Sequence, residues 1–187
     1  MSMLHSVVCL LGGCALFGSS HTCVAGDDHR PPPAYTFAAQ RSGIPSNVLF
    51  AVALQESGVT LRGQRLPWPW TLNIAGRGHY FKSRAEACTA LLTALTHVPA
   101  SRIDAGLTQI NLGHQRHFYG KPCELLWPHR NLEVAATLLR AHHRAGEDWL
   151  MAAGRFHRPA GGLLAAKYRR SVARHLNDMA VTSRDRP

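Results

Sequence analysis

One largely apolar segment, residues 45–57, constrains the fold of this chain more than any other feature. It contains no helix-breaking residue between Pro45, which suits the first turn of a helix, and Gly58. Its apolar side chains would occupy almost every side of that helix, so we expect the helix to pass through the middle of a globular domain. Glu56, near the C-terminal end, is the only ionisable side chain of the segment.

The rest of the chain predicts a mainly α single domain. Its 187 residues match one domain rather than two, and 45% hydrophobic with 17% charged residues excludes a disordered chain. Ser83, with Glu86 three residues later, has the spacing of a capping box that opens a helix. The other expected helices lie at residues 34–41, 131–145, 147–153 and 160–179, and the capped helix runs over 83–97.

A small β-hairpin is expected between the helices. Residues 71–74 and 79–81 flank the Gly-rich turn 75–78, and two of the four tryptophans, Trp68 and Trp70, come just before them. Residues 99–111 are expected to form a loop.

The first 25 residues predict export. They contain no Lys, Arg, Asp or Glu, and their apolar run 6–17 is too short to span a membrane as a helix. Small residues follow up to Ala25, as in a signal peptide. We therefore expect a signal peptide at 1–25, a Pro-rich leader at 26–33, one folded domain at 34–180 and a tail at 181–187. The alternatives are a lipoprotein cleavage box at 11–14, with Cys14 lipidated, and an ordinary buried N-terminal helix.

Export leaves two cysteines in the mature chain, Cys88 and Cys123. In an oxidising compartment they could form one disulfide, or they could remain as two buried thiols. No Cys-x-x-Cys pair and no His-Glu-x-x-His arrangement occurs, so no zinc site is expected.

The formal net charge of +10 favours an anionic partner. Nucleic acid, an acidic glycan and membrane headgroups all meet that condition, and so does a basic face that is simply solvated. Nucleic acid is the least favoured partner, because the chain carries an export signal and no recognised nucleic-acid-binding pattern.

Glu56 has the setting of a general acid. Burial and the negative end of its helix would both raise the pKa of this carboxyl, so that it keeps its proton near neutral pH. A protonated carboxyl of this kind can give its proton to the departing oxygen of a glycosidic bond. The alternative is a glutamate that reaches solvent or pairs with an arginine.

Two motifs give the chain a family resemblance. Glu56-Ser57-Gly58 closes the apolar helix, and the Gly-Leu-x-Gln-Ile-Asn stretch at 106–111 follows about fifty residues later. This pair resembles the soluble-type lytic transglycosylases, which share the goose-type lysozyme scaffold, over residues 35–176. Residues 67–76, 80–81 and 104–111 are similar to the specialised members encoded with conjugation, pilus and type IV secretion systems.

The resemblance implies a lysozyme-like fold with the small β-hairpin beside a substrate groove. Glu56 matches the sole catalytic carboxylate, and Ser57 matches a hydroxyl that positions the glycan or the acid. Gln109 and Asn111 match amides that face the bound saccharide, with loop capping as the alternative.

Further substrate contacts are expected from the groove walls. The family usually carries a Tyr-Asn pair on the far wall, where this chain has Phe156 and His157; we include both among the substrate-binding residues. Phe156 lacks the hydroxyl of the usual tyrosine. Two of the four aromatic residues at 68, 70, 80 and 81 are expected to line the groove, with Trp70 and Tyr80 preferred. Asp104 is expected to brace the loop rather than to act as a second catalytic carboxylate.

The reaction implied is cleavage of the bond between N-acetylmuramic acid and N-acetylglucosamine in peptidoglycan, with a 1,6-anhydro product. It needs no metal and no cofactor. We expect a periplasmic monomer that opens murein, in contact with components of a conjugation, pilus or secretion apparatus. The alternatives are a lysozyme-type hydrolase on the same scaffold and a non-catalytic glycan-binding component of such an apparatus.

Overall fold

The computed structural model describes residues 30–184, and it is a mainly helical single domain with small antiparallel sheets. The expected signal peptide, the box around Cys14 and residues 26–29 of the leader lie outside the described residues. Within the part described, no helix is both long enough and apolar enough to cross a membrane. The six α-helices are α1 (Pro33–Ser42), α2 (Ser46–Ser57), α3 (Arg84–Ala94), α4 (Pro128–His142), α5 (Trp149–His157) and α6 (Gly162–Arg184).

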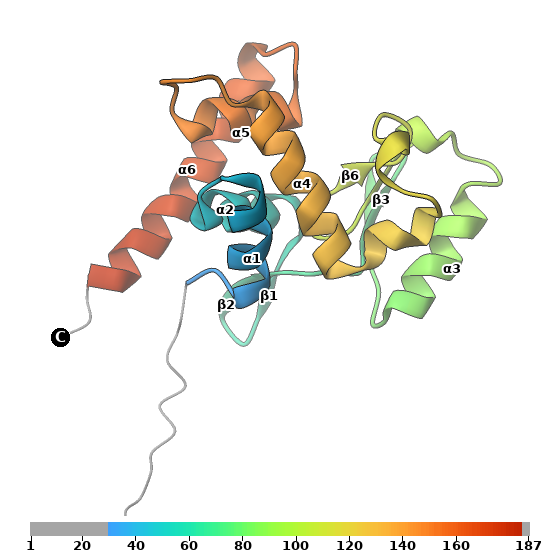
Figure 1. Ribbon diagram of the computed structural model, residues 1–187. Helices are drawn as coiled ribbons and strands as arrows, with labels where there is room; N and C mark the ends of the chain where they lie inside the picture. The colour runs from blue at the N-terminus through green and yellow to red at the C-terminus, as the bar shows by residue number, and fades with distance from the viewer. Residues whose placement is uncertain (1–29, 185–187) are drawn as a thin grey trace, which may run out of the picture.

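Helix α2 forms the centre of the domain, as its sequence predicts. Its residues 48–54 are all buried, and the helix packs against α1, α4, α5 and α6 (Figure 1). It ends where the chain turns into a strand at Gly58. A side chain there would collide with the Leu54 carbonyl oxygen, because an added Cβ would lie 2.3 Å from it. Glycine therefore lets the chain leave the helix directly.

Two antiparallel sheets lie beside the helices. β1 (Gly58–Leu61) pairs with β2 (Gln64–Pro67), and a four-stranded sheet has the order β4-β3-β5-β6. The predicted hairpin is present as β3 (Thr71–Ile74) and β4 (Arg77–Tyr80). The loop prediction for 99–111 was wrong in part, because β5 (Ile103–Ala105) and β6 (Ile110–Asn111) extend this sheet. Short 3-10 helices, η1 (Ala100–Arg102), η2 (Arg116–Phe118) and η3 (Pro122–Leu126), complete the chain.

Several helix boundaries differ from the predicted ones for local reasons. α4 begins three residues earlier than expected, at Pro128, because proline suits the first helical position. α5 begins after Asp148, whose side chain accepts a hydrogen bond from the Leu150 N–H. It continues through Gly154, where α6 approaches so closely that a Cβ would lie 2.9 Å from Arg169. α6 continues to Arg184, past the predicted start of the tail.

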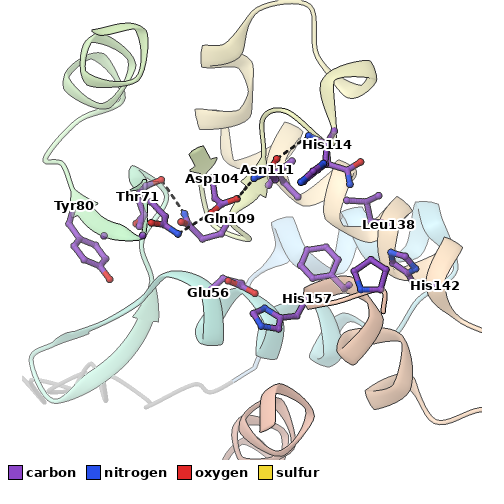
Figure 2. Close-up of a pocket in the computed structure, with 17 residues that line it drawn as sticks. Glu56, Thr71, Tyr80, Asp104, Gln109, Asn111, His114, Leu138, His142 and His157 are labelled. Carbon is purple, nitrogen blue, oxygen red and sulfur yellow. Dashed lines mark hydrogen bonds between the residues drawn. The ribbon is translucent and has the colours of Figure 1, made fainter. Parts of the chain in front are cut away.

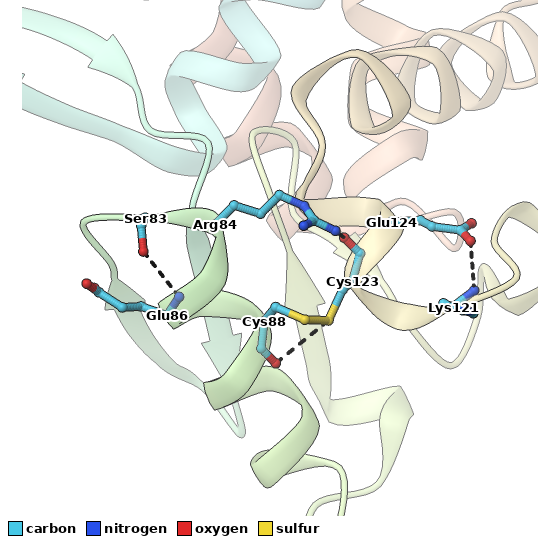
Figure 3. The surroundings of a disulfide bond; sticks show 7 residues. All are labelled: Ser83, Arg84, Glu86, Cys88, Lys121, Cys123 and Glu124. Carbon is cyan, nitrogen blue, oxygen red and sulfur yellow. Dashed lines mark hydrogen bonds between the residues drawn. A yellow bond between two sulfur atoms is a disulfide. The ribbon is translucent and has the colours of Figure 1, made fainter.

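The cysteines form the disulfide Cys88–Cys123, which links α3 to η3 with a Cα–Cα distance of 5.3 Å (Figure 3). Arg84 strengthens this junction, since its guanidinium donates to the Cys123 carbonyl oxygen and lies 4.0 Å from the centre of the Trp127 ring. At the start of α3, the Glu86 N–H donates to the Ser83 hydroxyl as predicted, whereas the Glu86 carboxylate accepts from the Lys82 N–H instead of completing the box at Ser83.

Candidate active site

A cavity of about 560 Å³ opens between the end of α2, the four-stranded sheet and the facing ends of α4 and α5 (Figure 2). Tyr80 lies toward one end of it, Glu56 lies at its centre, and His142 lies toward the other end. The cavity is lined by six of the eight residues that the sequence assigned to catalysis and substrate binding: Glu56, Tyr80, Gln109, Asn111, Phe156 and His157.

Glu56 occupies the position of a general acid. Glu56 as a whole residue is half-buried and lines the cavity, and desolvation of its carboxyl raises the pKa from 4.5 to about 7. The hydrogen bond from Tyr168 acts in the opposite direction, and the negative charge of Asp104 raises the pKa a little further. The upward shift expected from the sequence is therefore present, and it brings the pKa of Glu56 close to neutral pH.

Tyr168 of α6 is the main site residue that the sequence analysis missed. Its hydroxyl donates to Glu56 Oε1 at 2.7 Å, and burial together with the nearby carboxylate raises the tyrosine pKa well above its ordinary value. The tyrosine therefore remains a donor. It supplies Glu56 with a hydroxyl partner, although Phe156 on the cavity wall has none to give. The only sequence signal is the spacing of Ala165, Tyr168 and Val172, which marks a buried stripe of α6 and not a partner 112 residues away.

The ring of His157 fixes Tyr168 from the cavity side. The two rings stack with their centres 4.4 Å apart and their planes 5° from parallel. Burial and the charge of Arg158 lower the pKa of His157, so it is mainly neutral at neutral pH. His114 and His142 also line the cavity, and the sequence analysis had not singled out either of them.

Gln109 is held in an unusual backbone conformation, with φ +48°. Its Nε2 donates to the Gly106 carbonyl oxygen at 2.8 Å and to the Thr71 carbonyl oxygen at 3.2 Å. Among the described residues, no hydrogen bond engages its Oε1. The amide nitrogen therefore braces the loop, and the amide oxygen remains for a ligand in the cavity.

Asn111 follows the loop-capping alternative. Its Nδ2 donates to the Ser101 carbonyl oxygen and to Asp104 Oδ1, and its Oδ1 accepts from the N–H groups of Gly113 and His114. These four bonds use the full capacity of a primary amide. The residue lines the cavity, and its amide is engaged by the protein on both sides.

Asp104 braces the loop, as expected. Its two oxygens accept hydrogen bonds from the side chains of Asn73 and Asn111, at 3.0 and 2.8 Å. Burial raises its pKa, and the two amides partly offset that effect. Both carboxyl oxygens are thus engaged by the protein.

Ser57 and Trp70, two of the residues assigned to substrate binding, are not among those that line the cavity. Ser57 is fully buried, and its hydroxyl donates to the Leu107 carbonyl oxygen at 2.7 Å, which ties the end of α2 to the loop between β5 and β6. Trp70 is partly buried against the hydrophobic core. Of the four aromatic residues considered, only Tyr80 lines this cavity, where we had expected two.

Asn131 of α4 supports the loop from beneath and was also missed. It is fully buried, and its Oδ1 accepts from the N–H and the hydroxyl of Thr108. Its Nδ2 donates to the carbonyl oxygens of Ala105 and Leu125. Gly106 must lie against this amide, because a Cβ there would come within 2.3 Å of Nδ2. One side chain thus fixes the loop that carries Gln109.

Within residues 30–184, no group of three or more His, Cys, Asp or Glu side chains is arranged to hold a metal ion. Comparison with family models, with curated proteins and with solved structures finds no match for this chain.

Proposed function

We propose that the protein is a peptidoglycan lytic transglycosylase with a lysozyme-like fold. The observation that carries the proposal is Glu56: a half-buried residue that lines an open cavity, whose carboxyl has a pKa of about 7 and accepts a hydrogen bond from a tyrosine hydroxyl. A carboxyl that titrates near the working pH can both donate and accept a proton during one turnover.

The cavity supports a mechanism with one catalytic carboxylate. Hydrolysing glycosidases ordinarily use two. Asp104, the only other acidic residue among those lining the cavity, has both oxygens engaged by asparagine amides. Within this cavity Glu56 is therefore the carboxyl best placed to act on a substrate, and the second role falls to a group on the substrate itself.

The proposed reaction proceeds in two steps. Glu56 protonates the oxygen of the bond between N-acetylmuramic acid and N-acetylglucosamine, and the acetamido oxygen of the muramic acid residue attacks the anomeric carbon as that bond breaks. Glu56, now a carboxylate, then takes the proton of the C6 hydroxyl. That oxygen displaces the acetamido oxygen and closes the 1,6-anhydro ring. The Tyr168 hydrogen bond stabilises Glu56 in its charged form between the steps.

The surroundings of the site agree with an anionic substrate outside the cytoplasm. The net charge of +10 suits the lactyl and peptide carboxylates of murein. The Cys88–Cys123 disulfide is typical of an oxidising compartment, such as the periplasm. Local opening of murein for a conjugation, pilus or secretion apparatus is the role that we propose on this basis.

Product analysis tests the proposal. Intact murein is digested with the parent protein and with Glu56→Gln, and the fragments are analysed by mass spectrometry. Glu133→Gln on α4, outside the cavity, is the matched control. We expect 1,6-anhydro ends from the parent and the control, and none from Glu56→Gln. Reducing ends from the parent would assign the lysozyme-type hydrolase instead, and equal cleavage by Glu56→Gln would remove the catalytic assignment.

A further inference from the structure

The connection between α5 and α6 exposes two adjacent leucines. Gly161 and Gly162 turn the chain with φ values of +71° and +82°, and the first turn of α6 then presents Leu163 and Leu164 at 89% and 55% exposure. This connection lies at the upper edge of the molecule in Figure 1. Leu163 is the most exposed large hydrophobic residue of the described chain. Single exposed leucines are ordinary, but two in succession after a turn form a small exposed apolar patch, Leu163 and Leu164.

The helix that follows these leucines carries exposed basic residues. Between residues 149 and 177 the chain contains six Lys and Arg residues and no Asp or Glu, and only Arg155 of the six forms an ion pair with another described residue, Glu147. Lys167, Arg170 and Arg174 are all exposed, and their spacing continues the face of α6 that begins at Leu163. The first acidic residue on that face is Asp178, one turn further along. The small apolar patch at the start of α6 is therefore continuous with a basic stripe, formed by Lys167, Arg170 and Arg174, on the same side of the helix.

This combination distinguishes between the anionic partners that a basic protein can take. Murein offers carboxylates but no alkyl phase that would receive two leucine side chains. An anionic lipid bilayer offers both, because cationic side chains bind its headgroups while apolar side chains enter the boundary between headgroups and acyl chains.

We propose that the start of α6 docks on the surface of an anionic membrane, with Leu163 and Leu164 inserted and Lys167, Arg170 and Arg174 at the headgroups. The contact is peripheral. Pro159, in the same α5–α6 connection, lines the Glu56 cavity, so docking holds that cavity close to the membrane surface. The proposal does not depend on the reaction assigned to Glu56.

Vesicle co-sedimentation tests this docking. Protein lacking residues 1–25 is mixed with vesicles of equal parts phosphatidylglycerol and phosphatidylcholine, and with vesicles of phosphatidylcholine alone. The Leu163→Ser/Leu164→Ser variant is compared with Leu61→Ser/Leu92→Ser, which removes two exposed leucines elsewhere. We expect the α6 variant to need roughly tenfold more anionic lipid for half-maximal binding, and the control to bind like the parent.

A second pair of variants tests the basic stripe. Lys167→Gln/Arg170→Gln should weaken binding to the anionic vesicles, whereas Arg102→Gln/Arg144→Gln, with the same change of net charge at other exposed positions, should weaken it much less. The proposal is overturned if the parent does not bind anionic vesicles. It is equally overturned if the leucine variant binds them like the parent, or if the two charge variants weaken binding equally.

Discussion

Glu56→Gln should stabilise the folded protein above neutral pH, although it removes the proposed catalytic group. In the folded state the pKa of Glu56 is about 7, against an ordinary value of 4.5. A carboxyl whose pKa is raised in the folded state contributes most to the free energy of unfolding below pH 4.5, where it is protonated in both states. This contribution is lost as the pH rises through 7, because the folded protein then has to bury a charge. The gap of about 2.5 pH units corresponds to about 3 kcal/mol.

Urea denaturation with the disulfide intact, repeated from pH 4 to pH 9, measures this effect. Glutamine resembles the protonated carboxyl, so the variant and the parent should have similar free energies of unfolding at pH 4. As the pH rises through the neutral range, the free energy of unfolding of the variant should exceed that of the parent, by at most about 3 kcal/mol above pH 8. The control is Glu133→Gln, because any gain that it shares reports net charge rather than burial. If the difference in free energy of unfolding between Glu56→Gln and the parent does not vary with pH, the reasoning is refuted.

Three further predictions concern the supports of the site. Tyr168→Phe removes a hydrogen bond that lowers the pKa of Glu56, so the alkaline limb of the pH–rate profile for murein cleavage should move upward by roughly 1 pH unit; an unmoved limb would contradict the assigned contact. Asn131→Ala leaves its buried hydrogen-bonding partners unsatisfied, so it should lower the free energy of unfolding, measured in urea, by roughly 3 kcal/mol. A loss below about 1 kcal/mol would show that the loop does not depend on this amide. Replacing both Cys88 and Cys123 by serine should cost about 3 to 4 kcal/mol of the same free energy for a separation of 35 residues, and an unchanged urea midpoint would argue against the bridge in solution.

The sequence predicted those parts of the molecule that local chemistry determines. The central position of α2 follows from apolar residues on all its sides, and the hairpin of β3 and β4 follows from a Gly-rich turn between two short strands. The raised pKa of Glu56 follows from its place in the buried helix. The pairing of Cys88 with Cys123 was left open, since spacing alone does not bring two Cα atoms within reach.

The parts that were missed depend on contacts between distant segments. Tyr168 reaches Glu56 only because α6 packs against α2, and nothing local to either helix indicates this pair. Asn131 looks like any polar residue near the start of a helix until η3 and the loop between β5 and β6 close around it. The amide of Asn111 was assigned to a saccharide because its hydrogen-bonding partners within the loop cannot be read from residue types.

The central claim is that Glu56 keeps a proton near neutral pH in the folded protein. Carbon-13 NMR of protein labelled at the glutamate side-chain carboxyls measures this directly, and Glu56→Gln identifies the resonance by its loss. We expect this resonance to titrate with a midpoint of about pH 7. A midpoint near 4.5 would contradict it, because Glu56 would then be ionised throughout the neutral range and could not serve as the acid.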